Sequence, residues 1–143
     1  MTFAQAVRAT PELEGAWQPG LRALGAKSAK VTLRNGSLCG GSVDIDAHLQ
    51  ARYPDKPRWD YAFGYAKTAH FVEVHPARTS EVDAVLAKYA WLRGWLLGKA
   101  PDLQSLPKEF HWVATNGISI LKSSPQSRLL ARNGLVPIRH LPL

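Results

Sequence analysis

Two carboxylic acids in the middle of the chain have the residue types and the spacing of a metal-binding pair. Asp60 opens the segment DYAFGY (60–65), and Glu73 lies inside the apolar run AHFVEVH (69–75). A lone glutamate in such a run is costly to bury unless it is paired, protonated or bound to a metal. Mg²⁺ is commonly bound by one or two carboxylates together with waters and substrate phosphates. The two acids therefore predict a hard-cation site between neighbouring strands.

The alternation of side chains along residues 69–75 decides which neighbours can join Glu73. Residues two apart in a strand project from the same face, so Glu73 shares its face with His75 and not with His70. A metal chelate between His70 and His75 is therefore excluded for a regular strand. His75 is instead predicted to act beside Glu73, because an imidazole can serve as a general base or polarise a water molecule.

A purely structural explanation of the same acids stays open. Asp60 could cap its strand, and Glu73 could pair with Arg58 or Arg78. A second acidic pair, Asp44 and Asp46, also shares one strand face just before the segment AHLQ. Its simplest role is capping of a following helix by Asp46, with metal binding as the alternative.

The charge of the chain favours a polyanionic partner. Eighteen Lys and Arg against eleven Asp and Glu give a net charge of +7, and a surplus of this size attracts phosphates over long range. We expect nucleic acid to be contacted by basic residues near Asp60, with one aromatic side chain available for stacking on a base. An ordinary solvated basic loop is the alternative. The predicted nucleic-acid-binding residues are Arg52, Lys56, Arg58, Trp59, Lys67 and Arg78.

The composition is that of one folded domain covering residues 1–143. Hydrophobic residues make up 45% of the chain and charged residues 20%, which is ordinary for a globular domain. No apolar run reaches the ~18 residues that a membrane span requires, and the N-terminal segment does not resemble a signal peptide. The single cysteine, Cys39, excludes an internal disulfide and suits a reducing cytoplasm. We therefore expect a cytoplasmic protein without a membrane partner.

The elements that position these residues can be predicted from periodicity and turn signals. We expect helices at residues 2–9, from Ser80 and at 126–132, and a hairpin of strands 60–65 and 69–75. Asn35-Gly36 and Thr115-Asn116-Gly117 predict two further hairpin turns, and Ser80 with Asp83 resembles a capping box. The order of elements predicts a mixed α/β or α+β domain, in which helices flank a central mixed sheet.

The long helix after Ser80 carries two apolar faces. One is a core-facing stripe at helical spacing. On the opposite face lie Trp91 and Trp95, four residues apart. Packing within the chain is one explanation of this tryptophan face, and an oligomer seam or a protein partner is the other. The core-facing stripe consists of Val82, Val85, Leu86, Tyr89, Leu92 and Leu96.

The spacing of the acids resembles the PD-(D/E)xK nuclease superfamily. The matching residues are Asp60 in RWDYAFGY and the triplet Glu73-Val74-His75 in FVEVHPA. The resemblance implies a restriction-endonuclease-like α-β-β-β-α-β core and hydrolysis of nucleic-acid phosphodiesters with Mg²⁺ or Mn²⁺. Asp60 and Glu73 would be the metal ligands, and the Val74 carbonyl oxygen could add a third. The catalytic residues would be Asp60, Glu73 and His75.

This chain departs from the family at one position, because His75 stands where the family has a lysine. Histidine offers a positive charge only when it is protonated. Lys67 in the hairpin, or Lys88 on the following helix, could supply the missing ammonium. The family also uses an early acid in some members, for which Glu12 and Glu14 are the candidates.

Three functions follow from these patterns. The first is a Mg²⁺-dependent nuclease acting on DNA or RNA. The second is a catalytically inactive relative that binds nucleic acid or a protein partner. The third is a subunit of a toxin, phage or defence system that assembles through Trp91 and Trp95.

Overall fold

Four strands form the central sheet of the molecule, in the order β2-β3-β4-β5. The computed structural model describes residues 1–143. Strand β3 pairs antiparallel with both β2 and β4, whereas β4 and β5 run parallel. The sheet is therefore mixed, as the sequence predicts. Its strands are β2 (Cys39–Asp44), β3 (Tyr61–Tyr65), β4 (Thr68–Arg78) and β5 (Lys108–Ser119).

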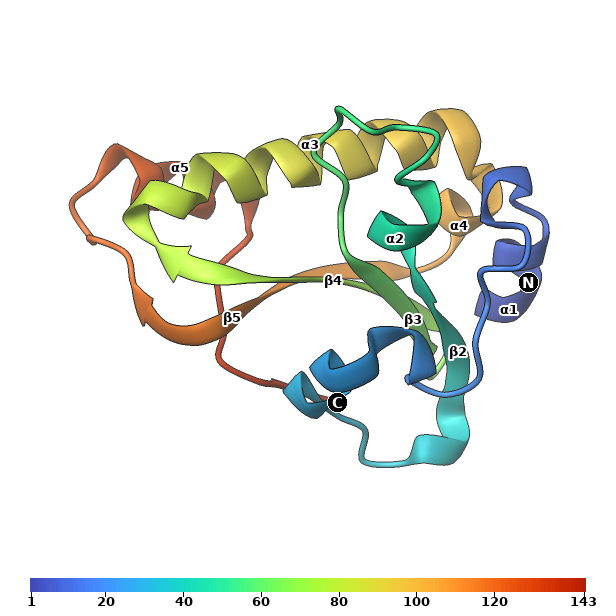
Figure 1. Cartoon of the computed structure of the whole chain (residues 1–143). Coiled ribbons are helices and arrows are strands. Elements are labelled where there is room, and N and C mark those ends of the chain that lie inside the picture. The colour runs from blue at the N-terminus through green and yellow to red at the C-terminus, as the bar shows by residue number, and fades with distance from the viewer.

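The two faces of the sheet have different covers. Figure 1 shows the long helix α3 crossing one face, where the other helices also gather, while the segment η2 and the C-terminus lie on the opposite side. The prediction of a mixed α+β domain with helices flanking a central sheet is confirmed. The helices are α1 (Phe3–Arg8), α2 (Ile45–Leu49), α3 (Val82–Lys99), α4 (Pro101–Ser105) and α5 (Pro125–Asn133).

Shorter elements complete the chain. Strand β1 (Val31–Thr32) pairs in parallel with β6 (Leu141–Pro142) to form a separate two-stranded sheet. The 3₁₀ segments are η1 (Pro11–Leu13), η2 (Arg22–Lys30), η3 (Gly36–Leu38) and η4 (Thr79–Glu81). No helix of the structure combines the length and the apolar character that crossing a membrane requires.

Each face of the sheet contributes to its own hydrophobic core. The larger cluster has 25 buried residues and lies between the sheet and the helices, with Trp59, Trp95 and Trp112 as its largest side chains. The smaller cluster has seven buried residues, among them Phe63 and Val72, on the side of η2. Phe71 and Val72 are neighbours in β4 and enter different clusters, which confirms the predicted alternation along this strand.

The hairpin of β3 and β4 sets the register of the candidate site. Its turn consists of Ala66 and Lys67, whose φ angles of 48° and 70° are both positive, as in the tight turns that favour hairpins. Tyr61 pairs with Val72, so the residues just before β3 lie opposite Glu73. The hairpin is as predicted, with a turn one residue shorter.

Two other predicted hairpins are wrong. Asn35-Gly36 opens η3 instead of a hairpin, and the preceding strand β1 pairs with the distant β6. Residues 115–117 lie inside β5, where the register shifts between His75 and Ala77 of the neighbouring strand. The turn signal at Thr115-Asn116-Gly117 thus marks an irregularity within a long strand, because the long β4 supplies pairing partners on both sides of it.

Two helix N-caps were also predicted, and both predictions are wrong. Asp44, and not Asp46, caps α2, since its carboxylate accepts a hydrogen bond from the Ala47 N–H at 2.9 Å. Helix α3 begins at Val82 without a side-chain cap, so the predicted capping box is absent. The last helix, predicted at 126–132, is present and extends one residue further at each end, with Ser124 as the N-cap and left-handed Gly134 at its end.

Most of the tryptophan face of α3 is covered within the chain. The rings of Trp91 and Trp95 stack with their centroids 5.9 Å apart, and Tyr53 meets Trp91 edge-on at 5.8 Å. Trp95 is buried and donates its indole N–H to Glu12. Intramolecular packing therefore accounts for Trp95, whereas Trp91 is partly buried and packs against the same core.

Candidate functional site

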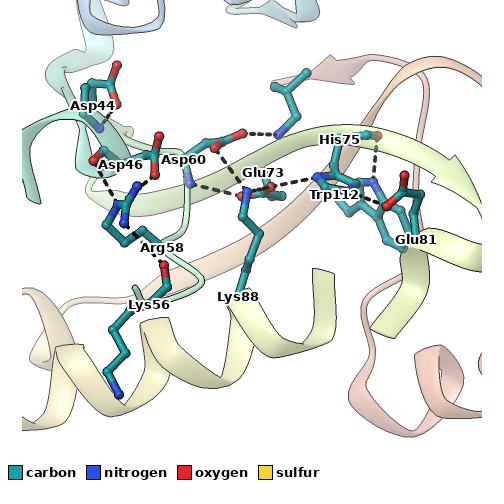
Figure 2. A network of polar contacts seen from close by, with 12 residues as sticks. Asp44, Asp46, Lys56, Arg58, Asp60, Glu73, His75, Glu81, Lys88 and Trp112 are labelled. Carbon is teal, nitrogen blue, oxygen red and sulfur yellow. Dashed lines mark hydrogen bonds and ion pairs between the residues drawn. The ribbon is translucent and has the colours of Figure 1, made fainter. Parts of the chain in front are cut away.

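The fold brings Asp60 and Glu73 together through reciprocal backbone hydrogen bonds. The Asp60 N–H donates to Glu73 Oε1 at 3.1 Å, and the Val74 N–H donates to Asp60 Oδ2 at 3.0 Å (Figure 2). Each carboxylate is fixed by the backbone of the other residue's strand. The other oxygen of each acid, Asp60 Oδ1 and Glu73 Oε2, takes no part in these two backbone hydrogen bonds.

A lysine from α3 contacts both remaining oxygens. The Lys88 ammonium donates to Glu73 Oε2 and lies 3.5 Å from Asp60 Oδ1. Lys88 lies between the buried residues Val85 and Leu92 along the helix, and its long side chain reaches down to the sheet (Figure 2). Of the two lysines considered as replacements for the family's motif lysine, the structure places Lys88 at the acids.

Lys67 lies elsewhere. It occupies the tight turn of the hairpin, six residues from Glu73 along the chain. At ~3.3 Å per strand residue this separation is roughly 20 Å. Lys67 and the two acids therefore lie at opposite ends of the hairpin.

Burial controls the electrostatics of this acid–lysine group. The Glu73 side chain has no exposed surface, whereas the side chains of Asp60 and Lys88 are about one-fifth exposed. Burial, reinforced by the charge of Glu73, raises the pKa of Asp60 to about 6. Burial alone would lower the pKa of Lys88, but the charges of Glu73 and Asp60 outweigh it and raise that pKa. The ammonium therefore stays charged and holds the two acids together.

His75 is held between two carboxylates. Its Nδ1 lies 3.4 Å from Glu73 Oε2 and its Nε2 lies 3.1 Å from Glu81 Oε2. The hydrogen bond to Glu73 raises the pKa of His75 against the opposing effect of burial, and the bond to Glu81 adds to it. Both ring nitrogens thus have acceptors, which favours the imidazolium over a free base. Glu81 is a site residue that sequence reasoning missed.

The donors of this group suit a hard cation. Asp60 Oδ1 and Glu73 Oε2 face one position, which the Lys88 ammonium occupies. Oxygen ligands of this kind bind Mg²⁺ or Mn²⁺ and leave the remaining positions to water and phosphate. Asp60 and Glu73 are the residues that could hold such an ion, as the sequence predicts.

The other candidate acids lie apart from this group. Glu12 accepts hydrogen bonds from the Tyr53 hydroxyl at 2.6 Å and from Trp95 Nε1 at 3.0 Å, so it links α3 to the N-terminal segment. Glu14 is exposed. Asp46 pairs with Arg58 at 3.0 Å. Neither early acid joins Asp60 and Glu73.

The predicted nucleic-acid-binding residues are scattered. Trp59 is completely buried in the larger core, so its ring cannot stack on a base as predicted, because a packed core leaves no room for one. Arg58 is 12% exposed and is tied to Asp46 and to the Tyr53 carbonyl oxygen. Arg78 pairs with Glu81 at 3.3 Å.

Arg52 and Lys56 keep exposed side chains. Arg52 lies 3.9 Å from Glu12, and Figure 2 shows the Lys56 ammonium pointing away from the Asp60 and Glu73 carboxylates. Of the predicted contacts, these two and Lys67 and Arg78 are the ones that solvent reaches.

The largest surface hollows do not coincide with the acids. One, of about 680 Å³, includes Phe3, Tyr65 and Lys67 in its lining, and another, of about 520 Å³, includes Arg22, Asp44 and His48. The acid–lysine group opens to solvent only through the partly exposed Asp60 and Lys88. A substrate would therefore meet it from the surface and not in a deep pocket.

Comparisons of this chain with protein-family models, curated proteins and solved structures gave no match.

Proposed function

We propose that this protein is a metal-dependent nuclease that hydrolyses nucleic-acid phosphodiesters with Mg²⁺ or Mn²⁺. The observation that carries the proposal is the convergence of Asp60, Glu73 and Lys88, which come from the segment just before β3, from β4 and from α3. When the short elements β1, α2, α4 and the 3₁₀ segments are left out, the order up to β5 is α1-β2-β3-β4-α3-β5. This order is compatible with the α-β-β-β-α-β core of the PD-(D/E)xK nucleases and supports the resemblance. A reducing cytoplasmic location belongs to the same proposal, because Cys39 has no partner for a disulfide.

Asp60 and Glu73 would hold the metal through Oδ1 and Oε2, the oxygens that the backbone leaves free. The bound ion would lower the pKa of a coordinated water and neutralise charge on the phosphate. Lys88 would give up its place between the acids and turn its ammonium toward the phosphate. There it would stabilise the negative charge that develops as water attacks phosphorus and the ester oxygen leaves.

Lys88 thereby takes the role of the motif lysine, and His75 takes a different one from that predicted. Because its two ring nitrogens face Glu73 and Glu81, His75 is better suited to hold Glu73 in place than to remove a proton from water. We propose His75 as a positioning residue whose loss weakens metal binding more than it changes the chemical step.

The net charge of +7 would raise the local concentration of a polyanionic substrate near the site. Arg52 and Lys56 are exposed basic residues in the segment that leads to Asp60. They would contact phosphates and supply affinity without sequence preference.

The test is a cleavage assay on plasmid DNA, single-stranded DNA and RNA with Mg²⁺, Mn²⁺ or EDTA. We expect metal-dependent cleavage that Glu73→Gln and Lys88→Met each reduce by about a hundredfold or more. Glu14→Gln is the matched control, since it removes an exposed acid of the same type that lies apart from Asp60 and Glu73. Cleavage that is unchanged in Glu73→Gln, or absent on every substrate and metal, would refute the nuclease.

A second candidate function is supported by the same salt bridges. Lys88 already neutralises the buried Glu73, so the group is stable without a metal and could be a structural remnant in an inactive, nucleic-acid-binding relative. Gel-shift binding that weakens steeply with salt, without cleavage in any metal, would favour this candidate.

A further inference from the structure

A second group of potential metal ligands lies on the opposite face of the sheet from Lys88. It consists of His70 on β4 and of Glu109 and His111 on β5. His70 pairs with Glu109 in the parallel register, and Val72, two residues further along the strand, pairs with His111. The two histidines are 41 positions apart in the sequence, so local spacing does not reveal this proximity.

The distances within this histidine–glutamate group are close to those of a tetrahedral site. His70 Nδ1 lies 2.9 Å from His111 Nε2, and Glu109 Oε2 lies 3.4 Å from the first and 3.8 Å from the second. Tetrahedral zinc with bonds of about 2.1 Å separates its ligand atoms by about 3.4 Å. Small side-chain rotations would therefore be enough to place all three atoms around one ion.

The surroundings keep the histidines ready to bind. The side chains of His70 and His111 are only 4% and 15% exposed, and the His70 ring lies 5.2 Å from that of Phe63. Burial, with the nearby His111, lowers the pKa of His70 to about 4, and burial also lowers the pKa of His111. Both imidazoles are therefore neutral near pH 7, the state in which they ligate a metal.

Without a metal, the hydrogen-bonding capacity of His70 Nδ1 and His111 Nε2 is only partly satisfied. Only one of them can carry the shared proton, so the pair makes a single hydrogen bond. A divalent ion in place of that proton would satisfy both lone pairs and the carboxylate together. Glu109 is 58% exposed, so the fourth position of such an ion would face solvent.

We propose that His70, Glu109 and His111 form a binding site for a zinc-class divalent metal ion, with a water or an external ligand in the fourth position. Imidazole nitrogens select such ions, whereas Mg²⁺ requires an oxygen-rich site. The site is independent of the proposed nuclease. It would also fasten β4 to β5 at the start of their parallel pairing.

The experiment is a titration of the untagged, chelator-treated chain with ZnCl₂ by calorimetry, with MgCl₂ as the comparison. We expect one Zn²⁺ per chain, a raised Tm with Zn²⁺, and no comparable binding of Mg²⁺ to this group. His111→Gln should weaken Zn²⁺ binding roughly a hundredfold or more. His48→Gln is the matched control, because His48 is an exposed histidine on α2 outside the group.

Two further measurements keep the result interpretable. Circular dichroism checks that His111→Gln is folded. The visible spectrum of bound Co²⁺ reports four-coordination, and bands that disappear in His111→Gln but stay in His48→Gln assign the ion to this group. Glu73→Gln should bind Zn²⁺ normally even if it abolishes cleavage, which separates this site from the nuclease. Zn²⁺ binding that is equal in His111→Gln and the parent chain, or no binding at micromolar Zn²⁺, overturns the proposal.

Discussion

The two faces of strand β4 carry side-chain groups that differ in charge, burial and chemistry, although they begin only three residues apart. On the α3 face, Glu73 is fully buried and is neutralised by Lys88. On the other face, His70 is nearly as buried but uncharged, and it shares one proton with His111. The first group is held together by full charges and the second by a single neutral hydrogen bond.

The comparison teaches that burial imposes different demands on different side chains. A buried carboxylate needs a counterion, which the fold supplies from a helix 15 residues further along the chain. A buried histidine can simply lose its proton. In the acid–lysine group the Lys88 ammonium already neutralises the carboxylates. The histidine–glutamate group has no such cation and can bind an external ion.

The largest expected effect on stability comes from removing Lys88, the counterion of Glu73. Lys88→Met should lower the free energy of unfolding by about 3 kcal/mol or more, because it leaves a fully buried Glu73 without its partner. Urea denaturation measures the change. The double variant Lys88→Met/Glu73→Gln should recover much of the loss, and Lys122→Met, at an exposed lysine, should change little. A loss below 0.5 kcal/mol in Lys88→Met would show that the acids do not depend on this ammonium.

In the metal-free protein, acid should change the contributions of His70 and Asp60 to the free energy of unfolding in opposite directions. The folded pKa of His70, about 4, is below its unfolded value near 6.5, so its stabilising contribution is complete above pH 6.5 and is lost as pH falls toward 4. The folded pKa of Asp60, about 6, is above its unfolded value near 3.8. Its contribution is therefore complete below pH 3.8 and is lost as pH rises through 6.

Unfolding free energies between pH 7 and 4, measured in chelator, separate the two contributions. One proton changes the stability by at most about 1.4 kcal/mol per pH unit. Relative to the parent chain, His70→Phe should flatten the loss of stability in acid, and Asp60→Asn should steepen it. Equal slopes in both variants would contradict the opposite pH responses of Asp60 and His70.

Disrupting the neutral His70–His111 pair should lower the free energy of unfolding by less than disrupting the charged Glu73–Lys88 pair. His111→Gln in chelator should lower the free energy of unfolding by about 1 kcal/mol, the net value of one neutral hydrogen bond. With saturating Zn²⁺ the same substitution should cost more, because the parent chain gains binding energy that the variant lacks. The two denaturation curves, with and without Zn²⁺, test this directly; if they differ by the same amount in both chains, the ion binds elsewhere.

The smallest expected effect lies at the surface. Lys56→Ala should reduce the slope of log Kd against log salt by about 1 for nucleic acid, if Lys56 makes one phosphate contact, and should leave stability unchanged. Lys108→Ala is the comparison, since the Lys108 ammonium donates to the Gln104 carbonyl oxygen and is not among the predicted contacts. A Lys56→Ala slope equal to that of the parent chain would remove Lys56 from the interface.

The features of the fold that depend on residues close together in the chain could be predicted from the sequence. Alternation along β4 separates Glu73 and His75 from His70, and the structure confirms it because side-chain parity is fixed by the strand backbone. The β3–β4 hairpin and the acid pair follow from the same short stretch. The turn signals at residues 35–36 and 115–117 were misleading, since long-range pairing of β1 with β6 and of β4 with β5 overrides local turn preference.

What the sequence determined by itself was therefore which side chains share a face, that Asp60 faces Glu73 across a hairpin, and that a lysine on the next helix could reach them. Only the tertiary structure decided that Lys88 does reach them, that Trp59 is inside the core, and that His70 meets His111. The reason is physical: parity and hairpin register depend on a few adjacent residues. The parallel pairing of β4 with β5 is set by how the intervening α3 packs on the sheet, and no local spacing records that.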